Sequence, residues 1–173
     1  MFKINQISGS LTLLAQSVPT GGTSPLYLTL DPQGRFLYVV NTHSDDISAY
    51  AVGSDGSLTP IPGLPFPSGD STQGIVVNSS GEFVYVTAGS QVLGYSVGAG
   101  GELTPLPSSP FPAAGFLVSL TTDQSGHFVY AAATSSGVAG YALDSTTGAL
   151  TPLDSSPFST GGTSFFVTTT VGH

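Results

Sequence analysis

The sequence predicts an all-β propeller of four-stranded antiparallel blades, and two repeated patterns carry this prediction. The segment LTLDPQGRFLYVVN at residues 28–41 returns as VVNSSGEFVYVT at 76–87 and LTTDQSGHFVYA at 120–131, its glycine recurring after 47 and 45 residues. Each copy joins an apolar run to an aromatic run through a turn of Asp or Asn and Gly, which is the pattern of a β-hairpin. A strand-only repeat of about 40–50 residues is typical of propeller blades.

The second pattern, Gly-x-Leu-Thr, divides the chain into units. It occurs at Gly9, Gly56, Gly101 and Gly148, with spacings of 47, 45 and 47 residues. We name the strands of a blade A to D from the channel outward and place this turn between C and D. We therefore expect one domain, 1–173, made of C–D strands at 1–19, full blades at 20–68, 69–113 and 114–159, and a lone strand A in 160–173.

Apolar and aromatic runs give the expected strands of each unit. They are 26–30, 36–40, 47–52 and 58–60; then 75–78, 83–87, 92–97 and 103–106; then 116–120, 128–132, 138–143 and 150–153; and finally strand A at 165–170. A proline recurs in strand D at Pro60, Pro105 and Pro152. Because proline cannot donate to a sheet ladder, D should be the outer edge of each blade. Strand C repeats a tyrosine, expected between blades, at Tyr50, Tyr95 and Tyr141.

Composition excludes several classes of partner. Two Lys and Arg residues stand against ten Asp and Glu, for a net charge of −8, so neither nucleic acid nor an anionic membrane surface is expected as a partner. The absence of cysteine excludes disulfides and thiolate metal sites. The N-terminal residues lack the pattern of a signal peptide, and no apolar run approaches the roughly 20 residues of a membrane span. The compartment stays unknown, although the composition is compatible with a secreted or periplasmic bacterial protein.

The motif DPQGRFLYV at residues 31–39, followed by GSLTP at 56–60, resembles the lactonase-type seven-bladed propellers, which include 6-phosphogluconolactonase-like and YVTN-repeat proteins. The resemblance covers nearly the whole chain, at about half the usual length. Its enzymes share a Gly-Pro-Arg-His segment on strand A and Arg, His and Glu side chains in the channel. The matching segments here, which begin at Ser24, Gln73 and Gly115, contain neither Arg nor His. The resemblance therefore implies the fold and supplies no catalytic residues, and Arg35 in an A–B turn should be structural.

Five residues are candidates for ligand binding on the face that carries the B–C and D–A loops and the channel mouth. They are His43, Asp45 and Asp46 in one B–C loop, and Asp70 and Gln73 in the following D–A loop. A histidine beside carboxylates can act as a general base or a metal ligand. The same loop can equally be a solvated Asx turn. We expect no metal and no cofactor.

Two functions remain open on the sequence. The first is a non-catalytic binding or interaction scaffold that holds a small neutral ligand or a protein partner at the channel mouth. The alternative is a lactone hydrolase acting on a neutral lactone, with His43 and the nearby aspartates. Because half a propeller leaves apolar blade faces uncovered, closure is expected. Two chains could form one ring, one chain could close into four blades, or the chain could be a fragment of a longer protein.

Overall fold

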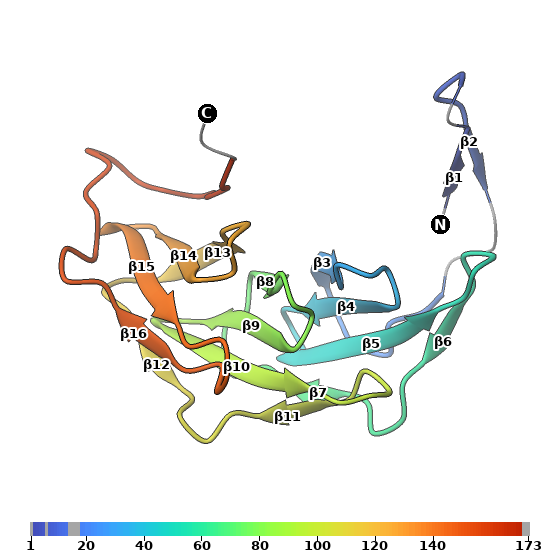
Figure 1. Ribbon diagram of the computed structural model, residues 1–173, viewed down its shortest axis with the longest axis horizontal. Coiled ribbons are helices and arrows are strands. Elements are labelled where there is room, and N and C mark those ends of the chain that lie inside the picture. The colour runs from blue at the N-terminus through green and yellow to red at the C-terminus, as the bar shows by residue number, and fades with distance from the viewer. Residues whose placement is uncertain (1, 6, 14–17, 171–173) are drawn as a thin grey trace.

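The computed structural model describes residues 2–5, 7–13 and 18–170, which form an open arc of antiparallel sheets (Figure 1). Three blade-like sheets follow one another along the arc, and a two-stranded hairpin lies at its N-terminal end. Over these ranges the chain contains no helix that could cross a membrane. The predicted all-β architecture is confirmed.

Each blade is a meander in which neighbours in sequence pair antiparallel. Blade I contains β3 (Pro25–Leu30), β4 (Phe36–Asn41), β5 (Asp46–Val52) and β6 (Leu58–Pro60). Blade II contains β8 (Ile75–Val77), β9 (Phe83–Ala88), β10 (Gln91–Val97) and β11 (Leu103–Pro105). Blade III contains β13 (Leu117–Thr122), β14 (Phe128–Ala133), β15 (Gly137–Leu143) and β16 (Leu150–Pro152). The N-terminal hairpin pairs β1 (Phe2–Ile4) with β2 (Leu11–Leu13), which confirms the predicted C–D pair.

The outer edge of each blade is the strand that ends in the repeated proline. Pro60, Pro105 and Pro152 close β6, β11 and β16, which are the terminal strands of their sheets, as predicted. The outer edge of two blades also contains a second short strand, which the sequence did not indicate. In blades I and II the short strands β7 (Phe66–Pro67) and β12 (Phe111–Pro112) return to pair with β5 and β10.

The predicted strand A at 165–170 is wrong, because none of these residues is assigned to a strand. The segment instead runs beside β13 through isolated bonds. The Val167 N–H donates to Ser119 Oγ at 3.0 Å, and Thr169 Oγ1 donates to the carbonyl of Thr122 at 2.9 Å. A ladder needs a partner strand, and among the described residues no strand pairs with this segment. The segment therefore lies where an inner strand would lie, without the pairing that would make it one.

The core forms two layers between the blades, because each strand B is apolar on both faces, as predicted. In β4, Phe36, Tyr38 and Val40 are buried against blade II. The intervening Leu37 and Val39 point to the opposite side of blade I. A second layer lies between blades II and III and contains Phe83, Tyr85, Leu120, Val129 and Tyr141.

Tyrosines on strand B bond each blade to the next. The Tyr38 hydroxyl donates to the carbonyl of Gly101 at 2.9 Å, and the Tyr85 hydroxyl donates to the carbonyl of Gly148 at 2.7 Å. In both cases the acceptor is the glycine of the C–D turn in the following blade. We call this contact the tyrosine–glycine bond. It joins positions 63 residues apart in both cases, so it is a property of the repeat.

Tyrosines on strand C bond each blade to the chain segment that leads into it. The hydroxyls of Tyr50, Tyr95 and Tyr141 donate to the carbonyls of Pro19, Pro67 and Pro112 at 2.8, 2.6 and 3.0 Å. All three side chains are buried. Tyr95 and Tyr141 lie between blades as predicted, whereas Tyr50 lies on the side of blade I that no described blade covers. Both faces of every blade interface therefore contribute a buried hydroxyl with an acceptor.

These buried tyrosines predict a loss of stability in alkali. Burial raises the pKa of Tyr95 and of Tyr141 to about 12, and it also raises the pKa of Tyr38 and Tyr85. The unfolded chain releases these protons near pH 10, whereas the folded chain retains them. Stability is therefore full below about pH 10 and falls between pH 10 and 12, by about 1–2 kcal/mol per tyrosine. Urea unfolding followed by circular dichroism at pH 8 to 12, with tyrosinate absorbance recorded in parallel, checks this. Constant stability up to pH 12 would contradict it.

Candidate functional site

In blades I and III the residue that follows strand B bonds back onto the start of strand A, and in blade II a residue near the end of β9 does so. The N–H groups of Thr42, Thr87 and Thr134 donate to the carbonyls of Ser24, Gly74 and Phe116 at 3.0, 3.0 and 2.9 Å. The B–C and D–A loops consequently lie at the same end of every blade. We call this side of the molecule the upper face. All five predicted site residues lie on or beside it.

His43 and Asp45 lie in the first B–C loop, where Asp45 is half-buried. His43 is exposed, and its N–H donates to the carbonyl of Thr23 at 3.2 Å. Asp45 has a left-handed backbone, with φ of 50°, and its Oδ1 accepts from the N–H of Ser71 at 3.1 Å. That bond joins the loop to the next D–A loop, beside the exposed Asp70.

Asp46 is the first residue of β5 and is buried. Its Oδ1 accepts from Asn41 Nδ2 at 2.6 Å, and the same amide donates to Ser48 Oγ at 2.8 Å. Ser48 Oγ in turn donates to the carbonyl of Thr20 at 2.6 Å. The carboxylate therefore ties the B–C loop to the chain entering blade I and does not face the other candidates. Among the described residues, no three His, Asp or Glu side chains are placed to hold a metal ion.

Gln73 lines a hollow at the inner ends of the blades. Its N–H donates to Thr87 Oγ1 at 3.1 Å, which fixes its backbone at the start of blade II. The hollow has a volume of about 490 Å³. It is lined by Leu26, Tyr27, Gln73, Phe116, Val118, Thr134 and Phe165. We call it the channel-mouth hollow, since it gathers residues from all three blades and from the C-terminal segment.

The chemistry of the channel-mouth hollow is apolar with a few polar groups. Aliphatic and aromatic side chains form most of the wall, and Gln73 and Thr134 add an amide and a hydroxyl. No charged side chain is among its lining residues. A neutral ligand with an apolar face and hydroxyl or carbonyl groups fits such a wall. Of the five predicted residues, Gln73 is the one that reaches this hollow.

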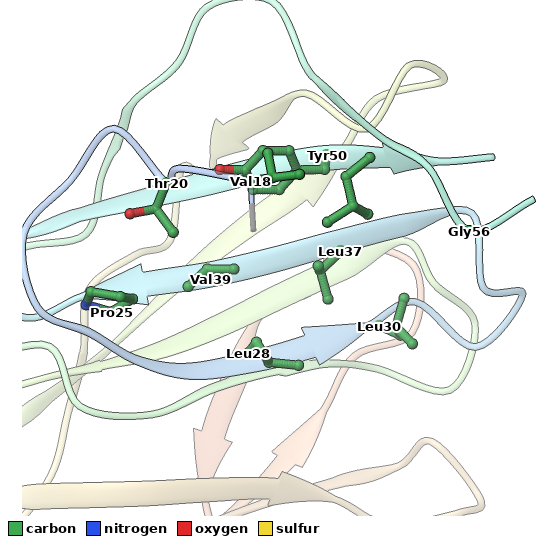
Figure 2. A pocket seen from close by; sticks show the side chains of 10 residues that line it. Val18, Thr20, Pro25, Leu28, Leu30, Leu37, Val39, Tyr50 and Gly56 are labelled. Carbon is green, nitrogen blue, oxygen red and sulfur yellow. The ribbon is translucent and has the colours of Figure 1, made fainter. Parts of the chain in front are cut away.

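A second hollow, of about 420 Å³, lies on the side of blade I that faces away from blade II (Figure 2). Its wall is almost entirely apolar and includes Val18, Leu28, Leu30, Leu37, Val39, Tyr50 and Leu58. Leu28 and Leu30 are 63% and 50% exposed, whereas Ile75 and Val77, at the same positions in blade II, are 8% and 6% exposed. This surface, the front face of blade I, is therefore a blade interface without its neighbour.

The chain's arginine and a second histidine lie at the opposite ends of the blades, in A–B turns. Arg35 Nε is 2.9 Å from Asp31 Oδ2, and its guanidinium lies 5.1 Å from the centroid of the Phe36 ring. His127 Nδ1 is 2.9 Å from Ser125 Oγ. The contacts of Arg35 are with residues of its own turn, and neither side chain lines the channel-mouth hollow.

Comparison with known proteins supports the predicted resemblance. The profile of the family described as "Lactonase, 7-bladed beta-propeller" matches residues 1–62. No curated protein matches the chain. The resemblance to lactonase-type propellers is thus confirmed over the first third of the chain, in the part where the motif at residues 31–39 and the first Gly-x-Leu-Thr-Pro lie.

Solved structures extend the fold likeness to most of the chain. A protein from Lactobacillus plantarum is 20% identical, with a TM-score of 0.73, over 88% of this chain and 47% of its own. A putative 6-phosphogluconolactonase from Bacteroides uniformis is 19% identical, with a TM-score of 0.74, over 88% and 46%. The Pseudomonas aeruginosa periplasmic gluconolactonase is 18% identical, with a TM-score of 0.71, over 87% and 48%. The predicted β-propeller fold is confirmed, and the chain spans about half the length of these structures.

Proposed function

We propose that the protein is a non-catalytic propeller scaffold that binds a small neutral ligand in the channel-mouth hollow. The lining of that hollow carries this proposal: apolar and aromatic walls, the Gln73 amide and the Thr134 hydroxyl, with no charged group among the lining residues. General acid–base catalysis needs a titratable group within hydrogen-bond reach of the reacting atoms. His43, the predicted base, does not line this hollow.

A neutral sugar lactone is a suitable probe for this site, because it offers hydroxyl and carbonyl groups without charge. We expect glucono-1,5-lactone to bind, and Gln73→Ala to weaken its binding about tenfold through the lost amide bond. His43→Ala is the matched control on the same face and should leave binding unchanged. Titration calorimetry measures the affinity, and circular dichroism verifies that both variants fold. Equal affinity in wild type and Gln73→Ala would contradict the assignment of the hollow.

A lactone hydrolase is the second candidate, favoured by the family profile and by neighbours described as gluconolactonases. In this reading His43 on the upper face works with Asp45 or Asp70, because Asp46, the third predicted partner, is buried against Asn41. The net charge of −8 opposes an anionic substrate, so the substrate would be a neutral lactone. Lactone turnover that His43→Ala abolishes would replace the scaffold proposal with this one. Preferential hydrolysis of a phosphorylated lactone would contradict both.

A further inference from the structure

The tyrosine–glycine bond has a third donor that lacks an acceptor. Tyr130 in β14 occupies the position of Tyr38 and Tyr85, 45 residues after the second of them. Within the described residues its hydroxyl has no hydrogen-bond partner, and its side chain is half-buried, whereas the other two tyrosines are fully buried. The rings of Phe128 and Tyr130 lie 6.3 Å apart between centroids.

The neighbours of Tyr130 form an apolar surface on the far side of blade III. We call it the rear face; it consists of Phe128, Tyr130, Val138, Leu153 and Phe158, and the side chains of Tyr130, Leu153 and Phe158 gather over Gly140. The equivalent residues of blade II, Phe83, Tyr85, Val92, Leu106 and Phe111, are buried against blade III. The rear face therefore carries the side chains that pack two blades together, and no described blade covers it.

The N-terminal hairpin contains the matching acceptor turn. The C–D turn of blade III accepts the hydrogen bond of Tyr85. In this turn, Asp144 N–H donates to the carbonyl of Ala149 at 3.0 Å, and Gly148 N–H donates to the carbonyl of Asp144 at 2.8 Å. In the hairpin, Asn5 N–H donates to the carbonyl of Ser10 at 2.9 Å, and Gly9 N–H donates to that of Asn5 at 2.8 Å. The two glycines also share a left-handed backbone, with φ of 71° and 69°.

That turn lacks the neighbour for which its shape is suited. A Cβ on Gly148 would lie 2.5 Å from Cδ1 of Phe83, whereas a Cβ on Gly9 would meet nothing within 4 Å. Leu150, two residues after Gly148, is 6% exposed, and Leu11, two residues after Gly9, is 61% exposed. The hairpin thus presents the receiving half of a blade interface to solvent.

We propose that the rear face of one copy packs on the N-terminal hairpin of a second copy, with the Tyr130 hydroxyl donating to the carbonyl of Gly9. The hairpin and blade III lie at opposite ends of the arc, so one chain in this conformation does not join them (Figure 1). The chain spans 46–48% of the propellers it matches, so two arcs supply about one ring. The occupant of the rear face is therefore a second copy of this chain.

In a closed pair the same contact forms twice, because each copy offers one rear face and one hairpin. The residues after blade III then run towards the inner side of the partner's hairpin, which makes a composite partial blade at each junction. This assembly does not depend on the ligand proposed above. Its test reads mass, so failure of one proposal is distinguishable from failure of the other.

Two exposed apolar residues of the hairpin provide a matched test. Leu11 corresponds to the buried Leu150, whereas Ile7, which is fully exposed, corresponds to the exposed Thr146. We expect wild type to have a mass of about twice 17.4 kDa in light scattering over a micromolar dilution series. Leu11→Asp should be monomeric throughout, since it would bury an unpaired carboxylate, and Ile7→Asp should remain dimeric. A monomeric wild type, or equal effects of the two substitutions, would overturn the proposal.

Tyr130→Phe removes only the hydroxyl. We expect about a tenfold loss per contact, and up to about a hundredfold in the dimer Kd, because the closed pair contains the contact twice. Tyr85→Phe removes the same group inside one chain, so it should lower the denaturation midpoint and leave the dimer Kd unchanged. Sedimentation equilibrium measures the dimer Kd of both variants. An unchanged Kd for Tyr130→Phe would overturn the assigned bond.

Discussion

Tyr85→Ala should lower the free energy of unfolding by about 3–5 kcal/mol, as for other large aromatic truncations in protein cores. The side chain is fully buried between blades II and III, and its hydroxyl bonds to Gly148, so the substitution leaves both a cavity and an unpaired carbonyl. Because the total free energy of unfolding of a domain is about 5–15 kcal/mol, this loss removes a large part of the stability. Urea unfolding followed by circular dichroism measures it.

Tyr130→Ala is the matched control, because it removes the same side chain from the same position in the next repeat. It is half-buried and makes no hydrogen bond within the described residues. In a Leu11→Asp background, which removes association, we expect a loss of about 1 kcal/mol or less. Equal losses at the two positions would show that Tyr85 has no special role between blades.

Gly148→Ala should lower the free energy of unfolding by about 3 kcal/mol, whereas Gly9→Ala should have little effect on the unfolding of the blades. Both glycines have a left-handed backbone, for which alanine costs about 1 kcal/mol. Only at Gly148 does the new methyl meet the Phe83 ring, at 2.5 Å, and such overpacking costs about 1–3 kcal/mol more. Thermal unfolding measures the difference, expected as about 10 °C in Tm.

The same pair of variants separates folding from association. Gly9 meets the rear face of the partner in the proposed pair, so Gly9→Ala should weaken the dimer while the thermal transition of the blades is retained. Gly148→Ala should lower the Tm of the blades and leave the dimer Kd unchanged in a sample that stays folded. A Gly9→Ala variant that dimerises as tightly as wild type would place the partner's Phe128 away from this turn.

Much of the fold could be predicted, because the signals are local and repeated. The turn at Gly34 and the continuous apolar run at residues 36–40 predict β4, which the structure extends by only one residue, to Asn41. The strand at 165–170 was wrong for a non-local reason. Its residues have the composition of an inner strand, but a strand also needs a partner, and the sequence of one segment does not say whether that partner exists.

The candidate site was predicted less well, because polar residues stand out in a sequence and the channel-mouth hollow is mostly apolar. The sequence predicts Asp46 in the B–C loop, but it is the first residue of β5. A shift of one residue in the strand boundary changes whether its carboxylate faces solvent or Asn41. A repeat-based comparison would have found more. Leu26, Gln73 and Val118 occupy the same position in three repeats, and all three line the hollow.

The prolines that close β6, β11 and β16 have a consequence for assembly. They remove a backbone donor from the outer rim of every blade, so sideways growth of the sheets is disfavoured. In the pair proposed above, the rear face and the hairpin are the two contact surfaces of each arc, so each copy would make two contacts. Rings, rather than branched aggregates, are the natural products of such a molecule, and the curvature of one arc sets how many copies close the circle.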